Sequence, residues 1–175
     1  TLGYTTNEQY KVIASIIKHT ALHIDSTTDI RGVELLSVLK NIYALILGVI
    51  DAKYNSPNTR FMILTKSFAE VRTILKKLGG SEDTLFLACG FGDLCLTSLN
   101  DLSRNRTLGL LIGKGFFNSD YKSNAVIVEG LNSITMFYSL LKDKDQKKLP
   151  IFNKLYNYFA NQEKELEFTF EELVD

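Results

Sequence analysis

The sequence has few side chains that bind transition metals, with two cysteines and two histidines in 175 residues. Cys89 and Cys95 lie six positions apart in one apolar segment, and this spacing matches no zinc-binding pattern. We therefore expect no metal site. Two cysteines in a chain of this size are typical of a reducing compartment with buried thiols, which predicts a cytoplasmic location, while a disulfide between them stays open.

An excess of charge of either sign is also lacking. Lysine plus arginine number 20 and aspartate plus glutamate number 20, so the net charge is zero. Nucleic acids and anionic membranes favour proteins with a basic excess, so neither partner is expected. A small basic pocket for a phosphorylated metabolite is compatible with these totals. With 45% apolar residues, the chain has enough hydrophobic side chains to bury a sizeable core.

No secretory signal is recognisable, because the first fifteen residues lack a basic stretch that leads into an apolar one. The longest apolar run, residues 33–50, approaches the length of a membrane span. Its first half contains Glu34, Ser37, Lys40 and Asn41, which are costly inside a bilayer. We therefore predict a buried helix of a soluble protein and no membrane insertion.

Two kinds of pattern divide the chain near residue 30. Before it, Leu2–Tyr4 and Ala21–Asp25 have the pattern of short strands on either side of a helix from about Thr6 to Lys18. Such a unit cannot bury both of its faces, so we expect it to be the last piece of something larger. The absence of an initial methionine also suggests a fragment. After residue 30 the apolar residues repeat with helical spacing. Helices are expected near residues 30–51, 57–79, 103–114, 129–143 and 150–160, with a short one near 168–174.

The helix over residues 30–51 is the most informative segment. Nearly all of its side chains from residue 33 to 50 are apolar, so most of its circumference must be buried. Its polar and small residues fall on one narrow strip: Glu34, Ser37, Lys40, Asn41, Ala44 and Gly48. In an ordinary helix such a strip meets solvent. In a functional one, partial desolvation prepares a lysine for proton exchange near neutral pH, and the adjacent asparagine orients a hydroxyl group.

A second segment places Gly90 and Gly92 before Asp93. It is similar to a dinucleotide fingerprint, but Cys95 replaces the third glycine and no clear βαβ unit follows, so we reject that interpretation. On a helix, Asp93 and Thr97 would share one face. An aspartate at the start of a helix is also a common N-cap, and the residues alone leave both roles open.

Two further helix starts carry polar groups. Ser103 is a suitable N-cap, and with Arg104, Asn105 and Arg106 it would form an anion site at the amides of a helix start. The alternative is an ordinary cap followed by two surface arginines. Glu129 follows an apolar run at the start of the next helix, where the helix dipole alone is enough to favour a carboxylate.

In this order and spacing, the motifs resemble those of NAD(P)-dependent glycerol-3-phosphate dehydrogenases. The segment from Gly32 to Asn41 is similar to the helix that carries the catalytic lysine of that family. Three later motifs follow in the family's order: residues 92–97, 103–106 and 128–130. The resemblance covers essentially the whole chain.

The resemblance implies a mainly α fold, because such enzymes join a nucleotide-binding Rossmann-type domain to a helical substrate domain. Residues 1–30 would be the C-terminal remnant of the Rossmann-type domain, its last strand, helix and strand. Residues 31–175 would be the all-helical substrate-binding and catalytic domain. The glycine-rich cofactor loop would lie upstream of these residues, so we expect the 175-residue chain to be inactive alone.

The resemblance also implies roles for individual residues. Lys40 would exchange the proton at the C2 oxygen while hydride moves between C2 and the nicotinamide. The substrate, glycerol 3-phosphate or dihydroxyacetone phosphate, would be bound by Lys40, Asn41, Asp93, Thr97, Ser103, Arg104 and Asn105. The cofactor, NAD or NADP, would be held mainly by the upstream domain and here by Arg104, Ile127 and Glu129. The reaction would supply a precursor of glycerophospholipids.

Two other functions remain open at this point. One is a related lysine-dependent dehydrogenase that acts on a 2-keto acid or another phosphorylated substrate; the Arg104 segment favours a phosphate-bearing one. The other is a non-catalytic helical module for dimerisation or partner binding. The eleven phenylalanines and eight tyrosines are compatible with a homodimer in any of these cases.

Overall fold

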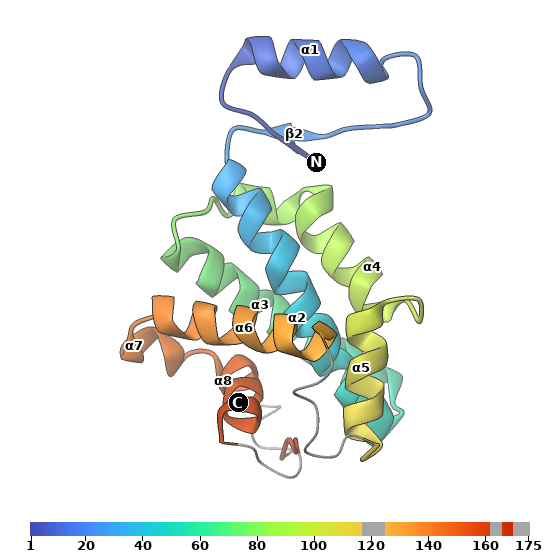
Figure 1. The fold of residues 1–175 in the computed structure, drawn as a ribbon, viewed down its shortest axis with the longest axis vertical. Helices are drawn as coiled ribbons and strands as arrows, with labels where there is room; N and C mark the ends of the chain where they lie inside the picture. Colours follow the sequence, from blue (N-terminus) through green and yellow to red (C-terminus); the bar gives the residue numbers. More distant parts are fainter. Residues whose placement is uncertain (117–124, 162–165, 170–175) are drawn as a thin grey trace.

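The computed structural model describes residues 1–116, 125–161 and 166–169, with the backbone alone for 125–131. Its N-terminal end is a strand–helix–strand unit, as predicted, and Figure 1 shows this unit standing at one end of the molecule. The two short strands pair in parallel, Leu2 with Ser26 and Gly3 with Thr27. The elements are β1 (Leu2–Gly3), α1 (Asn7–Ile17) and β2 (Ser26–Thr27).

The second strand lies later in the chain than the alternating pattern predicts. Residues 21–25 are not a strand, and β2 begins only at Ser26, so the predicted position was wrong. The reason is the lack of a partner strand along this stretch. Among the described residues, this stretch makes one backbone hydrogen bond with β1, which the Leu2 amide donates to the Asp25 carbonyl at 2.9 Å. An alternating sequence forms a strand only where a neighbour supplies such bonds.

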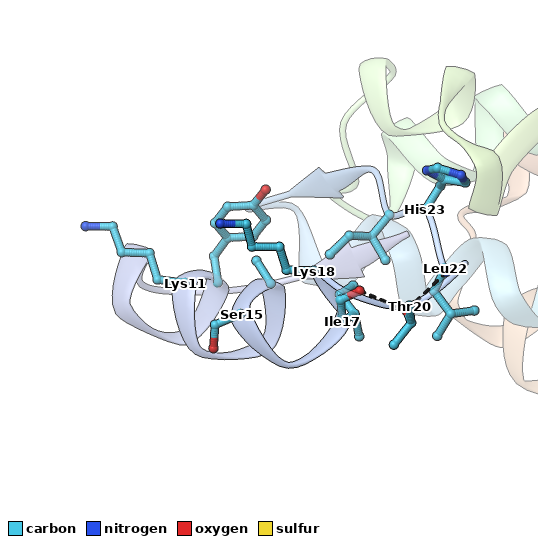
Figure 2. A pocket seen from close by; sticks show the side chains of 10 residues that line it. Lys11, Ser15, Ile17, Lys18, Thr20, Leu22 and His23 are labelled. Atoms are coloured by element: carbon cyan, nitrogen blue, oxygen red, sulfur yellow. Dashed lines mark hydrogen bonds between the residues drawn. The ribbon is translucent and has the colours of Figure 1, made fainter.

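Helix α1 is well capped but poorly covered. The Thr6 side chain accepts from the Gln9 amide and the Gln9 side chain accepts from the Thr6 amide, which forms a capping box. No residue of α1 is buried, and Val12 and Ile16 are 59% and 71% exposed. Figure 2 shows a pocket of about 480 Å³ beside α1, lined by the helix and by the loop that carries Thr20, Leu22 and His23.

Helix α2 (Ile30–Tyr54) is the central rod of the remaining structure (Figure 1). It starts at Asp29, whose carboxylate accepts from the Gly32 amide at 2.8 Å, and ends at Asn55 in the left-handed region with φ of 39°. Every residue from 42 to 50 is buried. By length and composition α2 is the one described helix that could cross a membrane, but it lies inside this fold, packed against α3, α4 and α5.

The other helices surround α2, and most agree with the predicted ranges to within a few residues. Two regions are exceptions. Residues 88–99 form a π-helix and a short α-helix that no predicted range included. The helix predicted for residues 129–143 runs from 125 to 140, and the charged residues after it form a separate short helix. A 3₁₀ turn, η1 (Asp83–Phe86), follows Ser81, whose hydroxyl accepts from the Asp83 amide. The remaining elements are α3 (Pro57–Lys77), the π-helix η2 (Ala88–Gly92), α4 (Asp93–Leu99), α5 (Arg104–Gly113), α6 (Ala125–Leu140), α7 (Asp143–Gln146) and α8 (Pro150–Ala160).

The predicted short helix near residues 168–174 is wrong where the structure describes it. Residues 168 and 169 belong to no helix, and residues 170–174 lie outside the described residues. Phe168 is nevertheless part of the hydrophobic core, and its carbonyl accepts from the Tyr54 hydroxyl at 2.6 Å. The chain near residue 168 is therefore fixed against the end of α2 by side-chain burial and not by helix formation.

The backbones of α2 and α5 pack directly against each other. A methyl group on Gly109 would lie 1.9 Å from the Leu45 carbonyl oxygen, and one on Gly48 would lie 2.2 Å from that of Arg106. Neither position has room for a side chain. We call this contact between α2 and α5, centred on Gly48 and Gly109, the glycine seam.

Candidate active site

Lys40 is half-buried on α2 and forms an ion pair with Asp93. Its ammonium nitrogen lies 2.5 Å from the Asp93 carboxylate, and the two side chains are 24% and 30% exposed. The strip to which Lys40 belongs runs from exposed Glu34 and Ser37 into the buried glycine seam. Lys40 therefore stands at the point where the polar strip of α2 leaves solvent.

Asp93 lies at the junction between a π-helix and an α-helix. The π-helix η2 runs directly into α4, and Asp93 is the first residue of α4. Its side chain does not cap the helix, because no side-chain cap bond forms at the start of α4. The N-cap alternative is therefore wrong. As predicted, Thr97 shares the face of α4, and its hydroxyl donates to the other Asp93 oxygen at 3.4 Å.

A cavity of about 310 Å³ lies beside this pair. Six of the seven residues predicted to bind the substrate line it. The seventh, Asp93, does not line the cavity but is paired with Lys40, which does. Two apolar side chains at its rim, Leu96 and Leu102, are 62% and 90% exposed. The lining residues are Lys40, Asn41, Leu96, Thr97, Asn100, Leu102, Ser103, Arg104 and Asn105.

The start of α5 forms the wall of the cavity opposite α2. Ser103 is the N-cap, and its hydroxyl accepts from the Arg106 amide at 3.3 Å. Arg104 is exposed, and within the part of the chain that the structure describes it forms no ion pair. A helix start with a free guanidinium and the amide of Asn105 beside it is suited to bind an anion such as a phosphate group.

The two arginines of this segment have different surroundings. The prediction of an anion site included Arg106, and the alternative made both arginines surface residues. Neither holds for Arg106, whose side chain turns inward and is 6% exposed. It forms an ion pair with Asp51 of α2, which is 7% exposed. A buried guanidinium needs a carboxylate partner, and Arg106 reaches one only by leaving the cavity.

Asn41 and the two residues predicted for the cofactor side have less definite geometry. The Asn41 side-chain amide donates to the Ser37 carbonyl at 3.3 Å, and Asn41 lines the cavity with its side-chain oxygen still available as an acceptor. Ile127 and Glu129 fall in the backbone of α6, and their side chains lie outside the described residues. Among the residues that the structure does describe, no three His, Cys, Asp or Glu side chains gather as a metal site would require.

Sequence reasoning missed the buried ionic cluster behind the cavity. Asp51 pairs with Arg106 of α5 and with Arg60 of α3, whose Nε lies 2.5 Å from the carboxylate. One signal could have revealed it. Asp51 directly follows nine consecutive uncharged and mostly apolar residues, 42–50, and a carboxylate that continues such a buried helix requires cationic partners.

Comparison with known protein families gives one match over most of the chain. The model of the NAD-dependent glycerol-3-phosphate dehydrogenase C-terminus matches residues 29–169. The matched range begins one residue before α2 and contains the whole cavity described above.

Individual relatives point the same way. The chain is 35% identical over 164 residues to glycerol-3-phosphate dehydrogenase [NAD(P)+] of Methanothermobacter thermautotrophicus, covering 93% of this chain and 49% of the relative. It is 38% identical over 129 residues to a protein of the same name from Clostridium botulinum, covering 73% and 39%. The chain thus spans about half the length, or less, of the curated relatives it matches.

Solved structures share the fold. The crystal structure of glycerol-3-phosphate dehydrogenase from Coxiella burnetii superposes with a TM-score of 0.77 at 25% identity, covering 93% of this chain and 52% of that one. A structure from Dunaliella salina superposes with a TM-score of 0.75 at 21% identity, covering 93% and 30%, and supports the fold alone.

Proposed function

Because the chain belongs to the NAD-dependent glycerol-3-phosphate dehydrogenase family, we propose that it is the substrate-binding and catalytic part of such an enzyme. The proposed reaction interconverts sn-glycerol 3-phosphate and dihydroxyacetone phosphate with NAD or NADP and supplies a glycerophospholipid precursor. One observation carries the proposal: a half-buried lysine paired with a carboxylate faces, across one cavity, a helix start with a free guanidinium.

The residues of this chain would divide the work as follows. Arg104, Asn105 and the amides at the start of α5 bind the phosphate. Lys40 exchanges the proton at the C2 oxygen, which gains a proton in the reducing direction and loses it in the oxidising direction. The nicotinamide nucleotide, when bound, supplies or accepts the hydride at C2.

The surroundings of Lys40 support this role. Asp93 holds the ammonium group in one position, and Thr97 in turn donates a hydrogen bond to Asp93. Asn41 presents an acceptor to a substrate hydroxyl. Ser103 lines the cavity and accepts from the Arg106 amide through its hydroxyl oxygen, which leaves the hydroxyl proton to donate to a phosphate oxygen. Arg104 has no competing partner among the described residues, which fits an anionic group of either substrate or cofactor.

We place the boundary between two domains near residue 30. Residues 1–30 would complete an upstream Rossmann-type domain that holds most of the nucleotide, and residues 31–175 would form the helical domain. Two observations support this division: the family match begins at residue 29, and α1 leaves its apolar face uncovered. Ile127 and Glu129 stay proposed cofactor contacts, and the cytoplasmic location and the homodimer stay predictions.

The alternatives are less well supported. A purely structural helical module gives no reason for an ion pair between Lys40 and Asp93 at the edge of a cavity, and the named relatives are dehydrogenases. Arg104 could pair with the carboxylate of a 2-keto acid as well as with a phosphate group. The backbone amides of the helix start beside Arg104, together with the side chain of Asn105, favour the phosphate group, which has more acceptor oxygens.

The test is an assay of dihydroxyacetone phosphate reduction by this chain joined to an upstream nucleotide-binding domain. Lys40→Ala is expected to lower kcat by about 10²–10⁴-fold, the usual contribution of a positioned acid or base. Lys142→Ala removes an exposed lysine far along the chain and serves as the matched control. The 175-residue chain alone is expected to give no turnover.

Loss of less than threefold in Lys40→Ala would show that the lysine is not the acid/base. Activity on unphosphorylated or 2-keto acid substrates equal to that on dihydroxyacetone phosphate would show that the assigned substrate class is wrong.

A further inference from the structure

Arg106 is a buried cation that touches three separate segments. Its Nη1 atom forms an ion pair with the Asp51 carboxylate of α2 and donates to the Ser98 carbonyl of α4 at 3.2 Å. Its Nε atom donates to the Asp101 carboxylate, in the connection between α4 and α5, at 3.2 Å. One guanidinium group therefore joins α5 to α2, to the end of α4 and to the loop between them.

Each of the segments that Arg106 joins carries part of the proposed site. Helix α2 carries Lys40, α4 carries Asp93, and α5 begins with Arg104, two residues before Arg106 itself. The relative position of these groups depends on how the first turn of α5 sits against the other two helices. The planar fork of an arginine fixes several acceptors at set angles, which a flexible ammonium group does not.

Arg60 provides a natural comparison within the same cluster. It also pairs with Asp51, at 2.5 Å, and its side chain is 28% exposed. Arg60 lies on α3, which carries none of the proposed site residues. Arg60 and Arg106 therefore both neutralise Asp51, but only Arg106 connects that charge to the phosphate-binding helix start.

We infer that Arg106 is a positioning residue, which holds the first turn of α5 at a fixed place relative to Lys40 and Asp93 so that one phosphorylated substrate reaches both. It does not touch the substrate, because its side chain points away from the cavity into the interior. The identity of the ligand in this inference rests on the proposed function. The claim that Arg106 holds the first turn of α5 in place does not depend on it.

The test uses the 175-residue chain and two readouts. Arg106→Lys and its control Arg60→Lys both keep the charge beside Asp51. We expect Arg106→Lys to raise the Kd for glycerol 3-phosphate at least fivefold, measured by amide chemical shifts, and Arg60→Lys to leave it within twofold. We also expect amide exchange at residues 107–109 to rise at least tenfold in Arg106→Lys and less than threefold in Arg60→Lys, relative to the exchange of α2.

The outcomes separate the two proposals. Equal changes in both variants, or none in Arg106→Lys, would make Arg106 an ordinary structural ion-pair residue and overturn the inference. If the unmodified chain bound neither glycerol 3-phosphate nor inorganic phosphate, the proposed substrate would be wrong, while amide exchange would still decide the positioning role. If Arg106→Lys failed to fold, Asp101→Asn would replace it, because Asp101 is 86% exposed and its substitution should not prevent folding. Unchanged amide exchange at residues 107–109 in Asp101→Asn would also overturn the inference.

Discussion

Two acidic residues of the molecule meet very different surroundings. Asp93 keeps 30% of its side-chain surface exposed and pairs with Lys40 beside a cavity. Glu70 of α3 is only 4% exposed and lies in the core. Its carboxylate accepts from the Tyr43 hydroxyl at 2.8 Å and from the backbone amides of Ile151 and Phe152 at 2.8 and 3.0 Å. Glu70 therefore fixes the start of α8 to α2 and α3.

Burial raises the pKa of Glu70 from 4.5 to about 7, against the hydrogen bonds from Ile151, Tyr43 and Phe152, which lower it. A raised pKa in the folded state means that folding favours the protonated form. The stability that protonated Glu70 contributes is therefore fully present below the unfolded pKa of 4.5 and is lost as the pH rises through about 7. Over this range we expect a loss on the order of 3 kcal/mol in the free energy of unfolding.

Glu70→Gln tests this directly, because glutamine has the shape of the protonated carboxyl group, keeps one acceptor oxygen and does not titrate. Urea unfolding at pH 5 and pH 7.5 is expected to show a clear loss of stability in the natural chain and a much smaller one in the variant. Identical pH dependence in both proteins would mean that Glu70 is not the group responsible. Glu82→Gln is a suitable control, since Glu82 is part-exposed and paired with Arg72 and Lys76.

The residue types of the site could be predicted from the sequence, but their contacts could not. The polar strip of α2 and the shared face of Asp93 and Thr97 follow from helical periodicity alone. The pairing of Lys40 with Asp93 joins residues 53 positions apart, and no local pattern encodes it. Arg106 was misassigned for the same reason: its partner Asp51 lies 55 positions away.

At the scale of whole elements, the glycine seam decides how α2 and α5 cross. Gly48 and Gly109 allow the two backbones to touch, and the side chains of both helices then interlock on either side. Both helices contribute to the walls of the cavity, together with α4 and the connection between α4 and α5. The separation between Lys40 and Arg104 is therefore set by the absence of side chains at the seam.

Gly109→Ala is expected to lower the free energy of unfolding by about 1–3 kcal/mol, because its methyl group would overlap the Leu45 carbonyl oxygen and force α5 away from α2. Gly92→Ala is the matched control: it has helical backbone angles and nothing within 4 Å of the added methyl group. We expect that variant to stay within about 1 kcal/mol of the natural chain. Thermal unfolding measures both, and equal stabilities would contradict the importance of the seam.

The helices were predictable because their caps and apolar periods agree. Ser56 followed by Pro57, and Ser103 before Arg104, mark the starts of α3 and α5, and the structure begins both helices there. The strand over residues 21–25 failed because a strand depends on a distant partner. The π-helix η2 also had no visible signal, since its glycines are equally typical of a turn.

At the scale of the whole molecule, the N-terminal unit differs from the helical domain in what it leaves uncovered. Its helix α1 buries no residue, whereas every residue of α2 from 42 to 51 is buried. Figure 1 shows the unit at one end of the molecule, apart from the helices that surround α2. Yet the unit is attached firmly. Asp29 caps α2 and also accepts from the Ser81 amide and the Thr84 hydroxyl, each at 2.7 Å. These bonds tie the junction between β2 and α2 to the segment after α3, while the apolar residues Val12 and Ile16 of α1 stay exposed.

Ile16→Asn tests whether a further domain covers this face. In the 175-residue chain we expect a change within about 0.5 kcal/mol in the free energy of unfolding, as for other surface positions. In the chain joined to a nucleotide-binding domain we expect a loss of about 1.5–3 kcal/mol, the value of a buried isoleucine. Leu140→Asn, at a position 55% exposed on the helical domain, should be near neutral in both proteins. Equal effects of Ile16→Asn in the two proteins would contradict the proposed covering.

The seam between α2 and α5 has a final consequence for ligand binding. Glycine has no rotamers, so the seam forms without loss of side-chain entropy and offers no second arrangement into which the two helices could relax. Arg106 adds a rigid, planar link at the same crossing. A phosphorylated molecule that enters the cavity would therefore find the amine and the start of α5 already in place, and little of its binding energy would be consumed in moving the helices.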